Sequence, residues 1–243
     1  MIVRVFLGFC IAIMTFAAAE AQEAARNPWK YNVGGGLSFT QGNKDTSTYN
    51  ASYNVTYSPG PRRTFKSDAL LLRGKTNGEL SHDRFGLNLR EEVRIGEHMF
   101  VFGQNQYLRD RFKRIQYLVA PTAGLGLTAV ATEATTLTFD AGAGGVWEKN
   151  PYVDVRASGA LTFSQKLTQA ISGSTTLTQS LSGLWKTEDM ADAIYQAGIA
   201  VTLGINARVQ FKIEALDTYN TKPTGTMIRK NDVSTVFAIV IKN

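Results

Sequence analysis

The sequence predicts an all-β protein, an antiparallel transmembrane β-barrel of about twelve strands. Apolar and polar residues alternate with a period of two along almost all of residues 29–243, and helical periodicity is absent there. Beyond the N-terminal residues, no stretch has enough consecutive apolar residues for a membrane helix. The mean hydropathy of -0.13 suits a soluble chain. It suits a barrel equally, because lipid-facing and interior-facing residues average out.

The N-terminus has the three parts of a cleavable export signal. Arg4 supplies the positive charge, residues 5–16 form the apolar run, and Ala19-Glu20-Ala21 is a small-x-small cleavage site. An uncleaved anchor helix is the alternative, but the apolar run is shorter than the roughly 20 residues that a spanning helix needs. We therefore expect a signal peptide over 1–21, a short periplasmic segment over 22–28 and the barrel over 29–243. Export would follow the Sec pathway to the outer membrane.

The strands can be followed along the chain in order. Tyr31 to Phe39 form a first strand, which a turn at Gly42-Asn43 closes. The clearest strand comes next, from Tyr49 to Tyr57, where every odd position is apolar or aromatic and every even position is polar. Similar strands follow, with apolar faces at 85–95, 137–143, 155–163, 195–203, 209–213 and 233–241.

Less regular stretches fill the gaps at roughly 63–75, 99–110, 115–128 and 170–184. Counting them gives about twelve strands, mostly of the ~10 residues that cross a bilayer at a tilt. We prefer an even number because both ends of such a barrel should lie on the periplasmic side. Ten or fourteen strands remain alternatives.

The connections are expected to be short on one side and longer on the other, as in this class of barrel. Periplasmic turns are predicted at 58–61, 96–98, 131–133 and 204–206, and outward loops at 76–82, 109–114, 148–153, 186–191 and 220–230. Aromatic residues near strand ends would form two interfacial girdles. They are Trp29, Tyr31, Tyr57, Phe65, Tyr107, Trp147, Tyr152, Trp185 and Tyr219.

Little in the sequence points to catalysis or to a bound cofactor. Cys10 is the only cysteine and lies in the export signal, so the mature chain has no thiol nucleophile and no cysteine metal site. His82 and His98 are expected on opposite sides of the membrane, and neither has a Ser/His/acid set nearby. The glycine clusters precede strands, not the helix that a phosphate-binding loop requires. We expect no enzymatic activity, no cofactor, no metal and, without a basic cluster, no nucleic-acid partner.

Charged side chains take the parity opposite to the apolar face, so we expect them to point into the lumen, because charges are costly against lipid. The lumen-facing candidates are Arg84, Arg90, Glu92, Arg94, Asp154, Arg156, Arg208, Lys212 and Glu214. In one interpretation opposite charges pair and fill a closed interior. In the other, an excess of Arg and Lys lines a narrow pore that favours anions. Size does not decide, because about twelve strands lies between filled barrels of about eight and open channels of about sixteen.

Several motifs resemble those of a known family. They are Gly36 to Thr46 (GLSFTQGNKDT), Tyr107 to Phe112 (YLRDRF), Gly124-Leu125-Gly126, and Tyr219 to Gly225 (YNTKPTG) followed by Lys230-Asn231-Asp232. Together they are similar to the salt-induced outer membrane protein family, a group of outer-membrane barrels of unknown function. The resemblance spans essentially the whole mature chain. It implies an outer-membrane barrel in a salt-related setting and names no mechanism.

Two functions are therefore considered first: a structural or stress-related role without catalysis, or a small-solute or anion-selective channel. An outer-membrane enzyme is a third. The expected partners are outer-membrane lipid and, during biogenesis, the barrel assembly machinery, while the oligomeric state stays open. Barrels of this class usually end on an aromatic residue that the machinery reads. This chain ends in Ile241-Lys242-Asn243, and Phe237 is its last aromatic residue.

Overall fold

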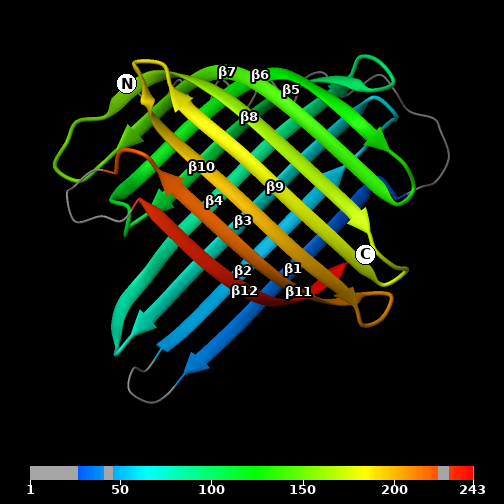
Figure 1. The fold of residues 1–243 in the computed structure, drawn as a ribbon, viewed down its shortest axis with the longest axis horizontal. Coiled ribbons are helices and arrows are strands. Elements are labelled where there is room, and N and C mark those ends of the chain that lie inside the picture. Colours follow the sequence, from blue (N-terminus) through cyan, green and yellow to red (C-terminus); the bar gives the residue numbers. More distant parts are fainter. Residues whose placement is uncertain (1–26, 41–45, 224–229, 243) are drawn as a thin grey trace.

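The computed structural model describes residues 27–40, 46–223 and 230–242, which form one closed antiparallel β-barrel (Figure 1). Its twelve strands follow one another round the barrel in sequence order, which confirms the predicted class and strand number. They are β1 (Trp29–Thr40), β2 (Thr46–Tyr57), β3 (Arg63–Thr76), β4 (Glu79–Arg94), β5 (Met99–Asp110), β6 (Ile115–Ala131), β7 (Thr135–Lys149), β8 (Arg156–Ala170), β9 (Thr175–Lys186), β10 (Asp189–Gly204), β11 (Val209–Asn220) and β12 (Asn231–Lys242). We call the end where Trp29 and Lys242 lie the terminal end, and the opposite end the distal end.

The predicted export signal over 1–21, residues 22–26 and the Gly42-Asn43 turn lie outside the described residues. Within the described part of the chain, no helix is long and apolar enough to cross a membrane.

A short seam between β1 and β12 closes the barrel. The pairs run only from Asn32↔Lys242 to Gly35↔Ile239, whereas β1 and β2 pair along their whole length. Just beyond the seam, Asn50 Nδ2 donates a 3.3 Å hydrogen bond to the Phe237 carbonyl. A Cβ atom on residue 36 would lie 1.9 Å from that carbonyl oxygen, so only glycine fits there.

Odd-numbered strand residues point outwards and even-numbered ones inwards, as the period-two pattern predicts. Large apolar side chains such as Leu125, Ile199 and Ile239 are about half exposed on the outside, at 55%, 52% and 48%. Small inward-facing ones such as Ala120 and Val146 are buried, at 0% and 1%. An apolar outer belt of this kind is what lipid covers in a membrane barrel.

Aromatic side chains cluster near both ends of the barrel. At the terminal end, the ring of Tyr57 stacks on Trp29 with centroids 4.3 Å apart and on Phe65 with centroids 6.1 Å apart. Near the distal end, Trp185 Nε1 donates a 3.0 Å hydrogen bond to the Tyr195 hydroxyl. These two groups lie where the predicted girdles require them.

The connections at the distal end are shorter than predicted. Asn77-Gly78 alone joins β3 to β4, and both residues have positive φ (52° and 81°), as in a tight type I′ hairpin turn. Thr187-Glu188 likewise joins β9 to β10. The predicted loops over 76–82 and 186–191 are therefore wrong, because polar residues there continue the strands beyond the apolar belt.

Glycines on β6 and β7 let these strands approach closely. An added Cβ atom would lie 2.0 Å from the Ala141 carbonyl oxygen at Gly124, and 2.0 Å from the Pro121 carbonyl oxygen at Gly144. Both positions face inwards, where a side chain would collide with the neighbouring backbone. The glycine clusters therefore shape the wall, as glycines in strands commonly do.

Candidate functional site

The barrel encloses a cavity of about 390 Å³, which we call the chamber. Residues of β3 to β11 line it, among them Asp68, Arg84, Asn88, Arg90, Asp140 and Thr218. The interior is thus not completely filled by side chains. Two groups of polar contacts, one around Arg90 and one at the distal end, lie next to it.

Arg90 on β4 is the centre of the first group. Its guanidinium donates to Glu92 Oε1 at 2.8 Å, to Gln104 Oε1 at 2.9 Å and to Asp140 Oδ2 at 2.9 Å. Glu92 also receives Lys66 Nζ at 2.6 Å. The side chains of Arg90 and Asp140 are only 9% and 10% exposed, so water screens this pair little.

Aromatic rings on β5 support the guanidinium. The Arg90 Cζ atom lies 3.8 Å from the centroid of the Phe102 ring, a close cation–π contact. Phe100 and Phe102 are buried inside the barrel, at 9% and 4% exposure. A glycine on the neighbouring strand β6 makes room for Phe100, since a Cβ atom at Gly126, its cross-strand partner, would lie 2.1 Å from the Phe100 ring.

Three lysines from different walls reach the interior: Lys66 on β3, Lys166 on β8 and Lys212 on β11. Lys212 Nζ lies 2.7 Å from Glu214 Oε2. Lys166 lies within electrostatic reach of the other two lysines and forms no salt bridge within the part of the chain that the structure describes. Its side chain is exposed although it points inwards. Water therefore has access to the interior at this level.

The distal mouth is bridged by two cationic side chains. Lys113, in the connection after β5, donates from Nζ to the carbonyl oxygens of Thr218 at 2.9 Å and of Lys230 at 3.0 Å. Arg84 on β4 donates from Nη1 to Thr218 Oγ1 at 2.7 Å. In a ring of twelve strands β5 and β11 face each other, so these contacts cross the full width of the barrel.

The Lys113 side chain is held in place and buried. Asp110 Oδ1 accepts the backbone N–H groups of Phe112 at 3.1 Å and of Lys113 at 3.0 Å, which fixes the turn. Only 4% of Lys113 is exposed. Burial lowers the pKa of its ammonium, while the carboxylates of Asp232 and Asp110 oppose that shift.

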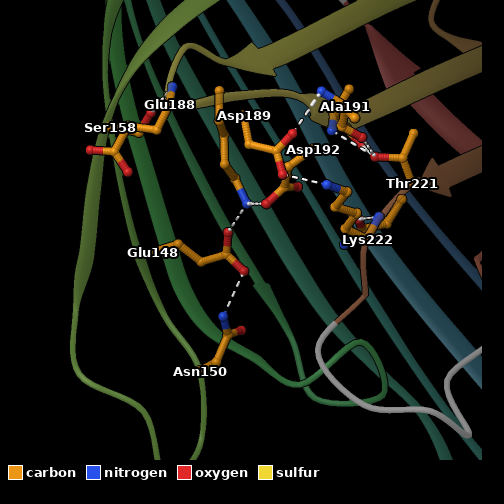
Figure 2. A network of polar contacts seen from close by, with 12 residues as sticks. Glu148, Asn150, Ser158, Glu188, Asp189, Ala191, Asp192, Thr221 and Lys222 are labelled. Carbon is orange, nitrogen blue, oxygen red and sulfur yellow. Dashed lines mark hydrogen bonds and ion pairs between the residues drawn. The ribbon is translucent and has the colours of Figure 1, made fainter.

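A further polar network joins the strands at the distal rim (Figure 2). Lys186 Nζ on β9 lies 2.6 Å from Glu148 Oε2 on β7 and 2.8 Å from Asp192 Oδ2 on β10. Asn150 Nδ2 donates to Glu148 Oε1 at 2.9 Å. Figure 2 shows Glu148 and Asp192 reaching toward each other from different segments. The buried cation is thus neutralised by two acids, which favours a structural role at this rim.

The structure places Arg84, Arg90, Glu92, Lys212 and Glu214 on inward-facing strand positions, as the sequence predicts for them. It brings Arg90 and Glu92 into one network, and Lys212 and Glu214 into a separate pair.

Two of the other four predicted lumen residues lie outside the strands. Asp154 and Arg208 are exposed in the connections before β8 and before β11, where side chains do not follow the strand period, so their assignment to strands is wrong. Arg94 and Arg156 keep the inward side, because they pair with the interior residues Phe100 and Glu148. Both are exposed at a strand end, as the last residue of β4 and the first of β8.

Histidine and acidic residues give no candidate metal or catalytic site in the described ranges. No group of three or more His, Cys, Asp or Glu residues there could hold a metal ion. His82 lies near the distal end of β4, and His98 in the connection after that strand, at the terminal end.

Comparison with protein families decides the assignment. The model of a family described as "Protein of unknown function, DUF481" matches residues 33–242. The chain belongs to the DUF481 family. This match confirms the predicted resemblance to a family of unknown function. The description of that family does not mention salt.

Several solved structures of membrane barrels are similar to this DUF481 chain. The NanC porin has a TM-score of 0.50 at 12% identity, with 87% of this chain and 98% of that chain covered. The KdgM porin has a TM-score of 0.47 at 6% identity, with 88% and 97% covered. An outer-membrane channel from Pseudomonas putida F1 has a TM-score of 0.48 at 11% identity, with 92% and 98% covered. At 12% identity, the likeness to the NanC porin shows the fold alone, a closed β-barrel. No curated protein matches the sequence.

Sequence reasoning missed several interior residues of this DUF481 chain. Lys66, Asp68 and Lys166 have the same even parity as the predicted set, so the parity rule alone would have found them. Lys66 and Asp68 lie in a stretch that alternates poorly. Lys113 could not be found in this way, because it leaves a connection and its direction is set by the turn at Asp110.

Proposed function

We propose that this protein is an outer-membrane channel for small polar solutes. The chamber of about 390 Å³ carries this proposal, because a purely structural barrel would have its interior filled by side chains. The exposed inward-facing side chain of Lys166 supports it, since water enters beside it. The fold shared with the NanC porin is consistent with a channel.

Charge selectivity is expected to be weak. Basic and acidic residues are equally numerous among the charged residues that line the chamber or face inwards between it and the terminal end. The bases are Lys66, Arg84, Arg90, Lys166 and Lys212, and the acids are Asp68, Glu92, Asp140, Glu214 and Asp217. Most of these bases form an ion pair with one of the acids, so the electrostatic potentials of the paired charges largely cancel in the lumen.

A modest preference for anions is the second candidate, and Lys166 favours it. This lysine has no salt bridge within the described part of the chain, and it lies within electrostatic reach of two other lysines as well as of Asp68 and Glu92, so the preference should be small. The zero-current potential across a bilayer with a KCl gradient measures the preference. Lys166→Gln should move that potential toward the non-selective value, while Lys75→Gln, at an exposed odd-numbered position of β3 and so on the outer face, should leave it unchanged.

Single-channel recording in planar bilayers tests the proposed channel. The folded protein should give steady current steps, and Gly86→Phe should reduce them, because Gly86 lines the chamber with open space around it. Gly103→Phe is the matched control, since that glycine also has open space but faces outwards. Gel mobility that differs between unheated and boiled samples would establish folding. Folded protein without steady current would contradict the proposal.

Location and partners complete the proposal. We infer insertion in the outer membrane after Sec export, with outer-membrane lipid around the apolar belt and the barrel assembly machinery as a transient partner. A salt-related or stress-related setting is compatible with a channel. Deleting the gene and measuring growth across salt concentrations would test that setting. We assign no catalytic role.

A further inference from the structure

The chamber has a distinct chemical lining that the proposed channel function leaves unexplained. Along β4, Arg84, Asn88 and Arg90 line it in turn, so it extends between the distal bridge and the Arg90 network. Between these ends, neutral amides and hydroxyls share the wall with apolar side chains such as Leu118 and Ile194. The polar residues of this part of the wall include Asn88, Gln106, Thr162, Ser180, Ser182 and Gln196, which come from β4, β5, β8, β9 and β10.

Most charged groups of the chamber wall are occupied by protein partners; Asp217 differs, because its Oδ1 is buried without a hydrogen-bond partner among the described residues. Arg90 is bonded to Asp140 at 2.9 Å, and Arg84 to Thr218 at 2.7 Å. Asp68 Oδ1 accepts a 3.3 Å hydrogen bond from Asn88 Nδ2. A charged solute in the chamber would have to displace one of these contacts, whereas a neutral one would not.

Some neutral groups of the wall lack a partner. Asn88 Oδ1 and Thr162 Oγ1 are buried and have no hydrogen-bond partner among the residues that the structure describes. Buried polar atoms in folded proteins nearly always find one. Both atoms are covered by neighbouring protein atoms, so a molecule in the chamber would first contact accessible groups of the wall, such as the exposed amide of Gln196 on β10.

Amides and hydroxyls both donate and accept hydrogen bonds. A solute that matches this wall carries hydrogen-bond donors and acceptors on all its sides and has no net charge. The volume of about 390 Å³ falls within the range of small-molecule pockets, roughly 300–1,000 Å³. We propose that the chamber is a binding site for a neutral polyhydroxylated solute of one or two sugar rings. The solute then passes through the channel, so the inference rests on the proposed function.

Current block by sugar tests this inference. Glucose should reduce the single-channel current in a saturable way, and glucuronate, which differs from glucose by one carboxylate, should do so at least tenfold less effectively. Gln196→Leu keeps the side-chain size and removes one amide from the wall. It should raise the half-blocking glucose concentration about three- to tenfold, the effect of about one hydrogen bond. Gln179→Leu, on the outer face, should not change it.

Calorimetry on the folded protein in detergent separates the two proposals. Glucose binding that Gln196→Leu weakens and Gln179→Leu leaves unchanged would support the chamber site, whatever the current. Steady current without saturable block and without binding heat would overturn the binding site and leave the channel standing. Stronger binding of glucuronate than of glucose would also overturn it, and would point to the lysines instead. A folded barrel without current contradicts the channel, and calorimetry still decides the site.

Discussion

Replacing Arg90 with alanine should destabilise the barrel more than replacing any other inward-facing base considered above. The substitution removes three hydrogen bonds and a ring contact at 3.8 Å. It also leaves Asp140, whose side chain is 10% exposed, without the cation that neutralises it. Breaking a buried ion pair by removing one partner costs about 3–5 kcal/mol. We expect a loss of this size in the free energy of unfolding.

Lys212→Ala is the matched comparison. Its pair with Glu214 has a similar length, 2.7 Å, but the two side chains are 31% and 20% exposed. A pair that water reaches contributes at most about 1 kcal/mol. Urea unfolding in lipid vesicles, followed by the fluorescence of the three tryptophans, gives both free energies. Equal losses for the two variants would refute the argument that burial inside the barrel sets the strength of these pairs.

Three other predictions concern the distal mouth and the wall. Lys113→Ala should increase single-channel conductance, because it removes the contacts that cross the barrel; unchanged conductance would show that these contacts do not limit flow. Burial lowers the Lys113 pKa below its ordinary value of 10.5, so the unfolded chain binds more protons between the two values. The stability of wild type relative to Lys113→Met should therefore rise with pH through that alkaline window, and a flat difference in urea midpoints would contradict this. Gly126→Ala should cost about 1–3 kcal/mol by overpacking against Phe100, whereas Gly86→Ala, with nothing near its added Cβ atom, should cost little in the same urea titration.

The fold could be predicted because membrane barrels tie side-chain direction to residue number. Each strand alternates between lipid and interior, and the middle of every strand keeps the inward parity on even residues. The alternation along the sequence therefore reveals both faces. Register shifts change the parity only near strand ends, as between Gly74 and Lys75 at the distal end and between Thr128 and Val130 at the terminal end.

Parity does not show which inward residues meet. Arg90 contacts Asp140 although 50 residues and two intervening strands separate them, and Arg84 reaches Thr218 across the barrel. These contacts depend on strand tilt and on the curvature that closes the ring, neither of which alternation encodes. The loop over 76–82 was predicted too long for the same reason. Its residues are all polar or small except Leu80, so the two-residue turn Asn77-Gly78 can be distinguished from them only when the pairing of β3 with β4 is known.

Two arginines on β4, Arg84 and Arg90, mark the two ends of the chamber along the barrel axis. Arg84 and Arg90 lie six steps apart on β4, which corresponds to about 20 Å along a strand at ~3.4 Å per residue. With a tilt of about 40° the two arginines differ by roughly 15 Å in height, about half the hydrocarbon thickness of a bilayer. A solute moving through the barrel would thus meet the distal bridge, then a long stretch with mostly uncharged side chains in which Asp68 lies opposite Asn88, and then the Arg90 network. Because β4 carries both ends of that stretch, substitutions on this strand should affect passage more than equivalent substitutions on β1 or β12, which do not line the chamber.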